Sequence, residues 1–216
     1  MKLTTTTSPQ RGIKFGKLLR VEQLTALTAE LQKLRSNPPL VKRTPGKDEG
    51  NILGFVRGLR LSARLIYFLR ERLSSTGLEV NWGHLLDQSE ESCSPECDVI
   101  VHTRGHLREW NGSNNPIMNF KFIEAASVRA VVSCKSLINS VDRRYPKTLK
   151  KHGVSDLFLF AECCRESRFQ QLHSSAKAAG YRGLWCLYLT QKDGSFQTDE
   201  SMYAAFGDAV FAAVKD

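Results

Sequence analysis

The sequence lacks several features that define familiar classes of protein. It has no run of about 18 apolar residues, so we expect no membrane-spanning segment. Its first residues contain no apolar core of a signal peptide, and six cysteines among 216 residues are too few for a disulfide scaffold. It also has neither a glycine-rich phosphate loop nor a nucleophile elbow around a serine. These absences favour a cytoplasmic protein with reduced thiols, and they argue against P-loop nucleotide binding and serine-hydrolase chemistry.

Acidic residues are scarce relative to basic ones. The chain has 31 Lys and Arg against 22 Asp and Glu, which gives a formal net charge of +9 at pH 7. A basic excess of this size favours a polyanionic partner. Nucleic acid is the first candidate, with DNA ahead of RNA, and an anionic membrane surface is the second. A basic surface that only contacts water is the alternative.

The length of the chain predicts one folded domain with a short N-terminal arm. Residues 1–17 are rich in Thr and Ser, and we expect them to be disordered. Residues 18–216 are expected to form a single domain with a sizeable core. Within it, leucines at helical spacing predict a helix over 18–34, and a basic, proline-containing connector follows as far as Lys47.

The hydrophobic pattern predicts alternating strands and helices in the rest of the chain. Helices are expected over 48–73, 139–152 and 165–179, with a final helix after Thr198. Strands are expected over 78–82, 98–103, 128–134, 157–161 and 183–189, with a short strand over 120–123 and a long loop over 104–121. This order implies a mixed sheet with helices on both faces.

Two of the expected strands carry unusual polar residues. The segment Ser94–Val101 places Asp98 at the start of one strand, and the segment Ser127–Leu137 places Lys135 at the end of another. Side chains alternate across a strand, so Ser133 and Lys135 share one face. A lysine that ends an apolar strand is uncommon, because its ammonium is costly to desolvate without an anion nearby.

Together these two segments resemble the core motif of the PD-(D/E)XK, or restriction-endonuclease-like, nuclease superfamily, and they are similar to small bacterial members of it. The resemblance covers about residues 46–162. It implies an α/β fold with an αβββαβ core, a mixed central sheet flanked by helices, an N-terminal helix and a C-terminal βα extension. In that superfamily carboxylates hold Mg²⁺ or Mn²⁺, and the lysine positions or polarises the attacking water. This sequence departs from the pattern at Ser133, where the superfamily usually has a glutamate that binds the metal.

The resemblance leaves the second carboxylate of the metal site open. The candidates, in order of preference, are Glu49, Glu124, Asp142 and Glu96. Glu49 ranks first because it opens a helix in the position where the superfamily often has a glutamate beside the metal, although it also fits a helix-capping role. The candidate catalytic residues are therefore Asp98, Lys135, Glu49 and Ser133, and the candidate metal ligands are Asp98, Glu49 and Glu124.

Basic residues on two expected helices are candidates for phosphate contacts. The helix over 48–73 has a strongly basic polar face, and more cations follow Lys135 in the next helix. The candidate nucleic-acid-binding residues are Arg57, Arg60, Arg64, Arg143, Arg144 and Lys147. We expect the two groups to form one groove that follows phosphates.

A zinc site is a competing interpretation of one short segment. The pairs Cys93 with Cys97 and His102 with His106 have metal-ligand spacing, but the gap between the pairs is far shorter than in a zinc finger.

Two functions from different classes follow. The first is a metal-dependent DNA endonuclease, in a restriction or phage-defence setting that only the resemblance suggests. The second is a catalytically degenerate member that binds nucleic acid or a partner protein without cleavage. A homodimer or a partner protein of a defence system is compatible with both.

Overall fold

The computed structural model describes residues 49–87, 92–111, 119–193, 195–198 and 200–215. The arm expected over 1–17, the helix expected over 18–34 and the connector to Lys47 lie outside these residues. The single domain expected over 18–216 therefore stays a prediction. None of the helices in the described part of the chain is long and apolar enough to cross a membrane.

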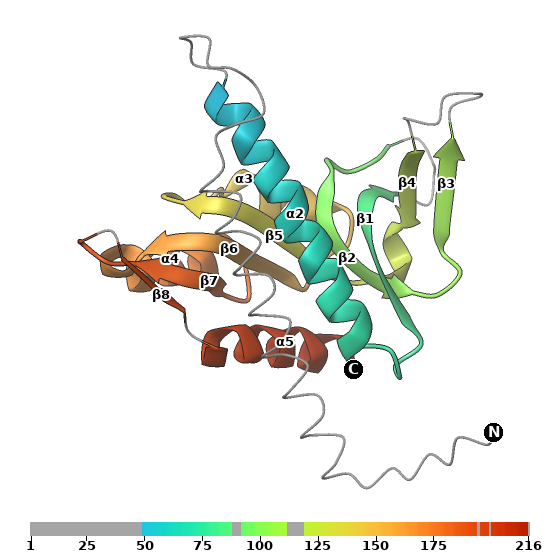
Figure 1. The fold of residues 1–216 in the computed structure, drawn as a ribbon. Helices are drawn as coiled ribbons and strands as arrows, with labels where there is room; N and C mark the ends of the chain where they lie inside the picture. The colour runs from blue at the N-terminus through green and yellow to red at the C-terminus, as the bar shows by residue number, and fades with distance from the viewer. Residues whose placement is uncertain (1–48, 88–91, 112–118, 194, 199, 216) are drawn as a thin grey trace, which may run out of the picture. The chain divides into compact units, whose positions relative to one another are not determined.

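In the described part of the chain, eight strands form one sheet with the order β3-β4-β1-β2-β5-β6-β7-β8 (Figure 1). The strands are β1 (Leu78–Leu86), β2 (Cys97–Thr103), β3 (Leu107–Asn111), β4 (Asn119–Glu124), β5 (Val128–Ile138), β6 (Leu157–Arg165), β7 (Leu184–Thr190) and β8 (Phe196–Thr198). β2 pairs antiparallel with both β1 and β5, whereas β5, β6 and β7 run parallel. The sheet is therefore mixed, as the sequence predicts.

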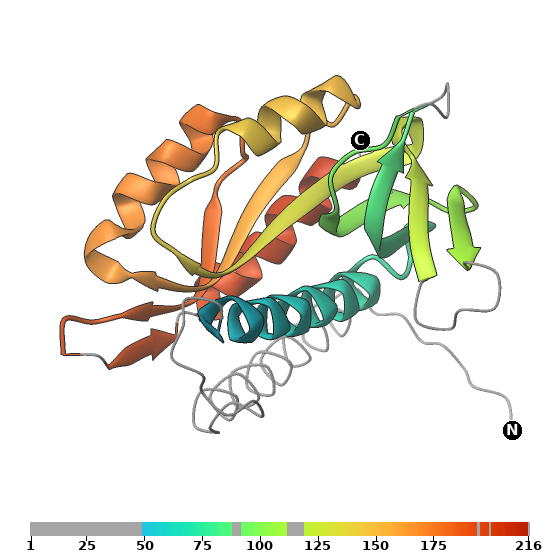
Figure 2. The same ribbon diagram turned by 90° about the horizontal axis from the view of Figure 1, so that it is seen from above.

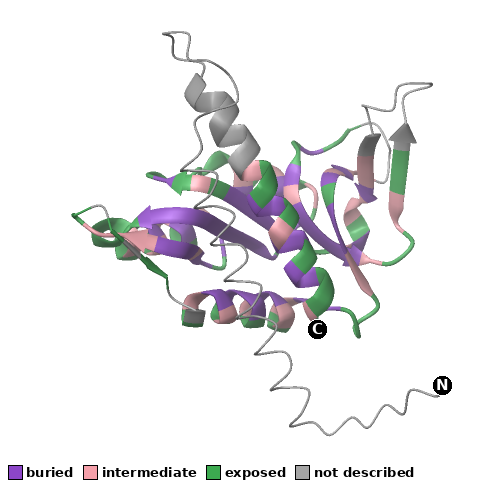
Figure 3. Cartoon of the chain, in the orientation of Figure 1, coloured by how far each residue is buried: buried purple, intermediate pink, exposed green. Residues whose placement is uncertain are grey.

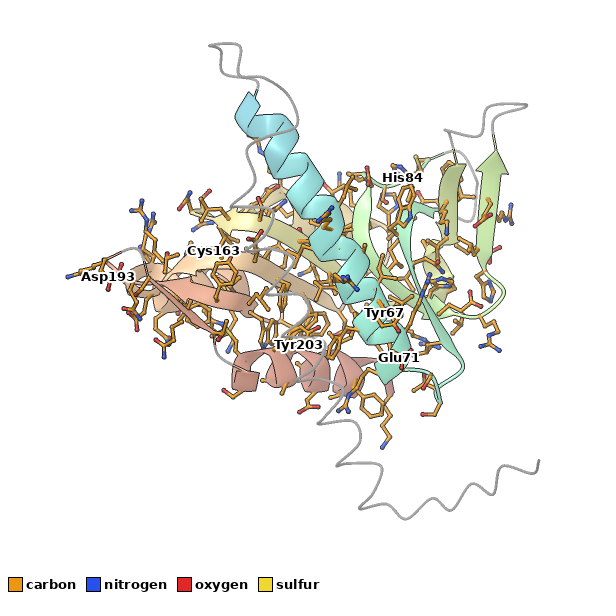
Figure 4. All side chains as sticks on the ribbon, viewed as in Figure 1. Tyr67, Glu71, His84, Cys163, Asp193 and Tyr203 are labelled. Atoms are coloured by element: carbon orange, nitrogen blue, oxygen red, sulfur yellow. The ribbon has the colours of Figure 1, made fainter. Side chains whose placement is uncertain are left out.

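Two helices, α2 (Glu49–Arg72) and α5 (Glu200–Lys215), pack on one face of the sheet. α2 follows the predicted helix to within one residue at each end, and its leucines at four-residue spacing are fully buried: Leu61, Leu65 and Leu69. The ring of Tyr203 on α5 lies 4.5 Å from that of Phe68 on α2 and 6.1 Å from that of Phe160 on β6, as centroid distances (Figure 4). Aromatic packing thus joins both helices to the sheet.

Two further helices, α3 (Arg144–Lys151) and α4 (Glu166–Ala179), cover the opposite face (Figure 2). Their inner residues form one buried cluster with alternate residues of the central strands, among them Val131 and Leu159. The neighbours Val132 and Phe160 point the other way, because side chains alternate along a strand. Buried residues are accordingly concentrated in the central strands (Figure 3).

The long loop expected over 104–121 is wrong in part, because β3 forms inside it. β3 pairs antiparallel with β4, and β4 confirms the short strand expected over 120–123. A second strand, β8, was not predicted. Both missed strands lie at edges of the sheet, where one side of the backbone faces no neighbour and the side-chain pattern is weak.

The helix expected over 139–152 is shorter than predicted, and β5 and β6 extend further. The Asp142 carboxylate accepts hydrogen bonds from the backbone N–H groups of Arg144, at 2.7 Å, and Tyr145, at 3.3 Å. Pro146 then occupies the first turn, where its missing N–H removes no helical hydrogen bond. The helix therefore starts at Arg144. Earlier in the chain, a 3₁₀ turn over Ala125–Ser127 connects β4 to β5.

Candidate active site

The register between β2 and β5 brings the polar residues of the two motifs together. Val99 pairs with Val132 and Ile100 with Val131, so Asp98 comes opposite Ser133 one step further along the antiparallel ladder. Residues opposite each other share a face, and Lys135 shares the face of Ser133. This is the face covered by α3 and α4, since Val131 and Ile100 belong to the cluster beneath these helices.

The Asp98 carboxylate is held by the backbone of the neighbouring strand. Its Oδ2 accepts a hydrogen bond of 2.8 Å from the N–H of Cys134. Burial raises the pKa of the Asp98 carboxyl, the hydrogen bond from Cys134 and the charge of Lys135 oppose that rise, and the charge of Glu96 adds to it. Asp98 is therefore a partly desolvated carboxylate with one cation and one further carboxylate in its field.

Lys135 is exposed, whereas Ser133 is only 2% exposed. No carboxylate oxygen of the described residues lies within 4.0 Å of the Lys135 ammonium, so it acts on Asp98 through space rather than as a direct ion pair. Lys135 lies inside β5, three residues before its end, and its side chain is exposed, so water reaches the ammonium and its desolvation cost is small.

Two tyrosines lie around the start of β2. The hydroxyl of Tyr145 on α3 donates to the Glu96 carbonyl at 3.4 Å, and the hydroxyl of Tyr181 donates to the Asp142 carbonyl at 3.3 Å. Burial raises the pKa of both phenols, and the charge of Asp98 contributes to each rise. Tyr145 thus links α3 to the segment that precedes Asp98.

The four candidates for the second carboxylate lie in different surroundings. Glu49 lies in the first turn of α2, but its side chain is outside the described residues. Glu124 binds the His106 ring at 2.6 Å and Arg108 at 3.1 Å, and these hydrogen bonds lower the pKa of its carboxyl. Asp142 holds the start of α3 through backbone N–H groups. Glu96 is the carboxylate of the described residues whose charge acts on Asp98.

The ligand pairs of the zinc interpretation do not come together. Cys93 is exposed, Cys97 is buried beside Ser94, and His106 binds Glu124. Both ring nitrogens of the buried His102 have partners, the Asn81 amide at 3.0 Å and the Thr103 carbonyl at 2.8 Å. Within the described ranges, no group of three or more His, Cys, Asp or Glu residues could hold a metal ion.

The predicted basic residues do not form a single groove, because α2 and α3 lie on opposite faces of the sheet (Figure 2). Arg60 is exposed and Arg64 half-buried on α2, and the Arg57 side chain is outside the described residues. Arg143, Arg144 and Lys147 are exposed at the start and on the outside of α3. The two groups therefore face different directions.

Sequence reasoning missed two parts of the site. The Cys134 N–H that binds Asp98 carries no signal in a sequence, because any residue but proline supplies it. Tyr145 did have a signal, since a large aromatic four residues before a leucine marks the inner side of a helix.

The described fold is similar to that of two solved structures. One is E. coli MS115-1 NucC in its cAAA-bound form, with a TM-score of 0.55 and 12% identity over 91% of this chain and 90% of that chain. The other is P. aeruginosa ATCC27853 NucC in its cAAA-bound form, with a TM-score of 0.56 and 12% identity over 91% of each chain. No family model matches the sequence, and no curated protein matches it. At this identity the likeness shows the fold alone, and it confirms the predicted fold class.

Proposed function

We propose that this chain is a metal-dependent endonuclease that hydrolyses phosphodiester bonds of DNA. The observation that carries the proposal is the placement of Asp98 opposite Ser133 on adjacent strands, with Lys135 on the same face and the Cys134 N–H on the carboxylate. The fold shared with NucC supports it. A restriction or phage-defence setting, and a homodimer or a partner protein, belong to the same proposal and rest on the family resemblance.

The oxygen donors around Asp98 suit a hard divalent cation. The Oδ2 of Asp98 is taken by the Cys134 N–H, but no hydrogen-bond donor among the described residues reaches its Oδ1. A hydroxyl stands opposite at Ser133, and the Glu96 carboxylate acts on Asp98 from the preceding residues. Mg²⁺ or Mn²⁺ is usually held by one or two carboxylates, with water and phosphate oxygens completing the shell. Asp98 and Glu96 would supply the carboxylates here, and Glu49 stays a further candidate.

Each residue has a distinct chemical task in this proposal. Ionised Asp98 binds the cation, and the Cys134 N–H keeps its carboxylate oriented while it does so. The exposed Lys135 ammonium orients the attacking water and lies near the charge that develops on the phosphate. The bound metal supplies Lewis acidity and lowers the pKa of water.

The direct test is incubation of the protein with plasmid DNA in Mg²⁺, Mn²⁺ or EDTA. We expect nicking that needs the metal and that falls by roughly a hundredfold or more in Asp98→Ala and in Lys135→Ala. Asp193→Asn, on the turn between β7 and β8, removes one exposed carboxylate elsewhere and should keep full activity. Glu96→Gln, Glu124→Gln and Asp142→Asn then decide among the three candidate second carboxylates whose side chains the structure describes. Metal-dependent cleavage that survives Asp98→Ala places the chemistry elsewhere.

A second candidate function is a nucleic-acid-binding protein of the same fold that does not cleave. It is favoured by Ser133, which provides a neutral oxygen where the resembling superfamily has a charged ligand. In this case the wild type is inert, and Ser133→Glu increases the thermal stabilisation produced by Mn²⁺, because it adds an anionic ligand beside Asp98. Ser133→Gln is the matched control: it has the same size without the charge, so it should show no such gain.

A further inference from the structure

Five cations are concentrated at the start and on the outside of α3. They are Arg143, Arg144, Lys147, Lys150 and Lys151, and all five are exposed. Among the described residues, no carboxylate oxygen lies within 4.0 Å of any of these side chains. We call this set the α3 cationic face. A concentration of charge with no internal partner is available for an external anion.

Two arginines of α2 are engaged within the domain. On α2, Arg70 donates to the Val80 carbonyl at 2.8 Å and to the Asn81 side chain at 2.9 Å. Arg72 pairs with Asp208 on α5. The basic surface that the sequence predicts for α2 is thus used in part to hold α2 against β1 and α5, and it is a poorer candidate for a phosphate track.

The fold fixes both the direction and the position of the α3 cationic face. Pro146 and Leu149 are buried against the sheet, so the charged side of α3 must face outward. The Tyr145 hydroxyl contacts the Glu96 carbonyl at 3.4 Å, two residues before Asp98. The start of α3 therefore lies next to the start of β2, where the candidate catalytic carboxylate lies.

We propose that the α3 cationic face, and not α2, binds the phosphate backbone of duplex DNA. The identity of the polyanion rests on the proposed function. The eight residues of α3 span about 12 Å, and duplex DNA carries one phosphate per about 1.7 Å of its axis, so several phosphates lie within reach of the helix. Arginine forks and lysine ammonium groups are the usual partners of phosphate oxygens.

The test is DNA binding in EDTA, so that cleavage plays no part. Fluorescence anisotropy with a labelled DNA duplex measures Kd for the full chain over a range of salt concentrations. We expect the triple variant Arg144→Ala, Lys147→Ala, Lys151→Ala to weaken binding by roughly tenfold or more at about 0.1 M salt, and to reduce the salt slope by about 0.9 per lost contact. Alanine favours helix, so α3 should persist, and circular dichroism checks this.

The matched control removes the same charge from other places. The triple variant Lys177→Ala, Lys192→Ala, Lys215→Ala changes exposed cations on α4, on the β7–β8 turn and on α5. It should keep the salt slope of the wild type. Arg60→Ala, on the exposed side of α2, should also bind as the wild type does.

Four results would overturn the inference. If the α3 triple variant binds DNA with wild-type affinity, the α3 cationic face does not contact the phosphates. If both triple variants lose the same affinity, binding depends on net charge and not on this face. If Arg60→Ala loses more affinity than the α3 triple variant, the contact lies on α2. Tighter binding to a matching RNA duplex overturns the assignment to DNA. Failure of the nuclease proposal is separate, because it appears as absent cleavage while α3-dependent binding in EDTA remains.

Discussion

Asp98 carries its charge where the surroundings oppose it. Burial raises the pKa of its carboxyl, and the Cys134 N–H and Lys135 only partly offset that effect. An ionised Asp98 therefore costs stability in the protein without a bound cation. The neutral Asp98 carboxyl contributes stability instead. This contribution is complete below the ordinary pKa of 3.8 and is lost as pH rises through the raised pKa of the folded protein. Such a cost is typical of a residue kept for binding or catalysis.

We expect Asp98→Asn to raise the melting temperature at neutral pH in EDTA by a few degrees. The amide removes the charge, and its oxygen can still accept the Cys134 N–H bond. The gain should shrink toward about pH 4, where the wild-type carboxyl also becomes neutral. Thermal unfolding of both proteins across this range measures the effect. A variant less stable than wild type at neutral pH would mean that Lys135 stabilises the charge more than burial destabilises it.

A glycine in β1 allows this strand to pack closely against β4 while it pairs with β2. β1 pairs with β2 on one side and β4 on the other, and its register with β2 shifts between Asn81 and Gly83. Gly83 has a φ of 145°, and a Cβ added to it would lie 2.2 Å from the Lys121 backbone oxygen. Only glycine permits both this backbone conformation and this close approach.

Gly83→Ala should therefore destabilise the domain by roughly 2–5 kcal/mol, because it adds both strain and a collision with β4 backbone. Gly105→Ala is the matched control. Gly105 also has a positive φ, of 88°, but nothing lies within 4 Å of an added Cβ, so the expected loss is about 1 kcal/mol. Urea unfolding measures both. Equal losses would show that backbone strain alone, and not the contact with β4, explains the effect.

The sequence predicts those elements whose pattern follows from burial. α2 and the central strands have apolar residues at the expected spacing because both contact a core. The edge strands β3 and β8 have weaker patterns and were missed. In the site, Asp98, Ser133 and Lys135 could be placed together from strand alternation and the resemblance. The position of Glu96 depends on how the chain enters β2 after Pro95, and sequence spacing does not define that geometry.

In the described part of the chain, the sheet separates two apolar layers, and both contain thiols. Cys164 and Cys186 belong to the cluster under α3 and α4, whereas Cys134 lies among the residues that point toward α2. Burial raises the pKa of the Cys134 thiol. Five of the six cysteines are buried and all six are free, so the thiols report whether both layers stay closed.

In the native protein, we expect Ellman's reagent to modify one thiol rapidly, and all six after unfolding in urea. The fast thiol should be Cys93, which is exposed, and Cys93→Ser should remove the fast phase without changing the rest of the time course. The five buried thiols should react only as fast as the layers open. A second fast thiol would contradict a closed core. Its identity, found by mass spectrometry of the labelled peptides, would tell which layer opens: Cys134 for the side of α2, and Cys164 or Cys186 for the side of α4.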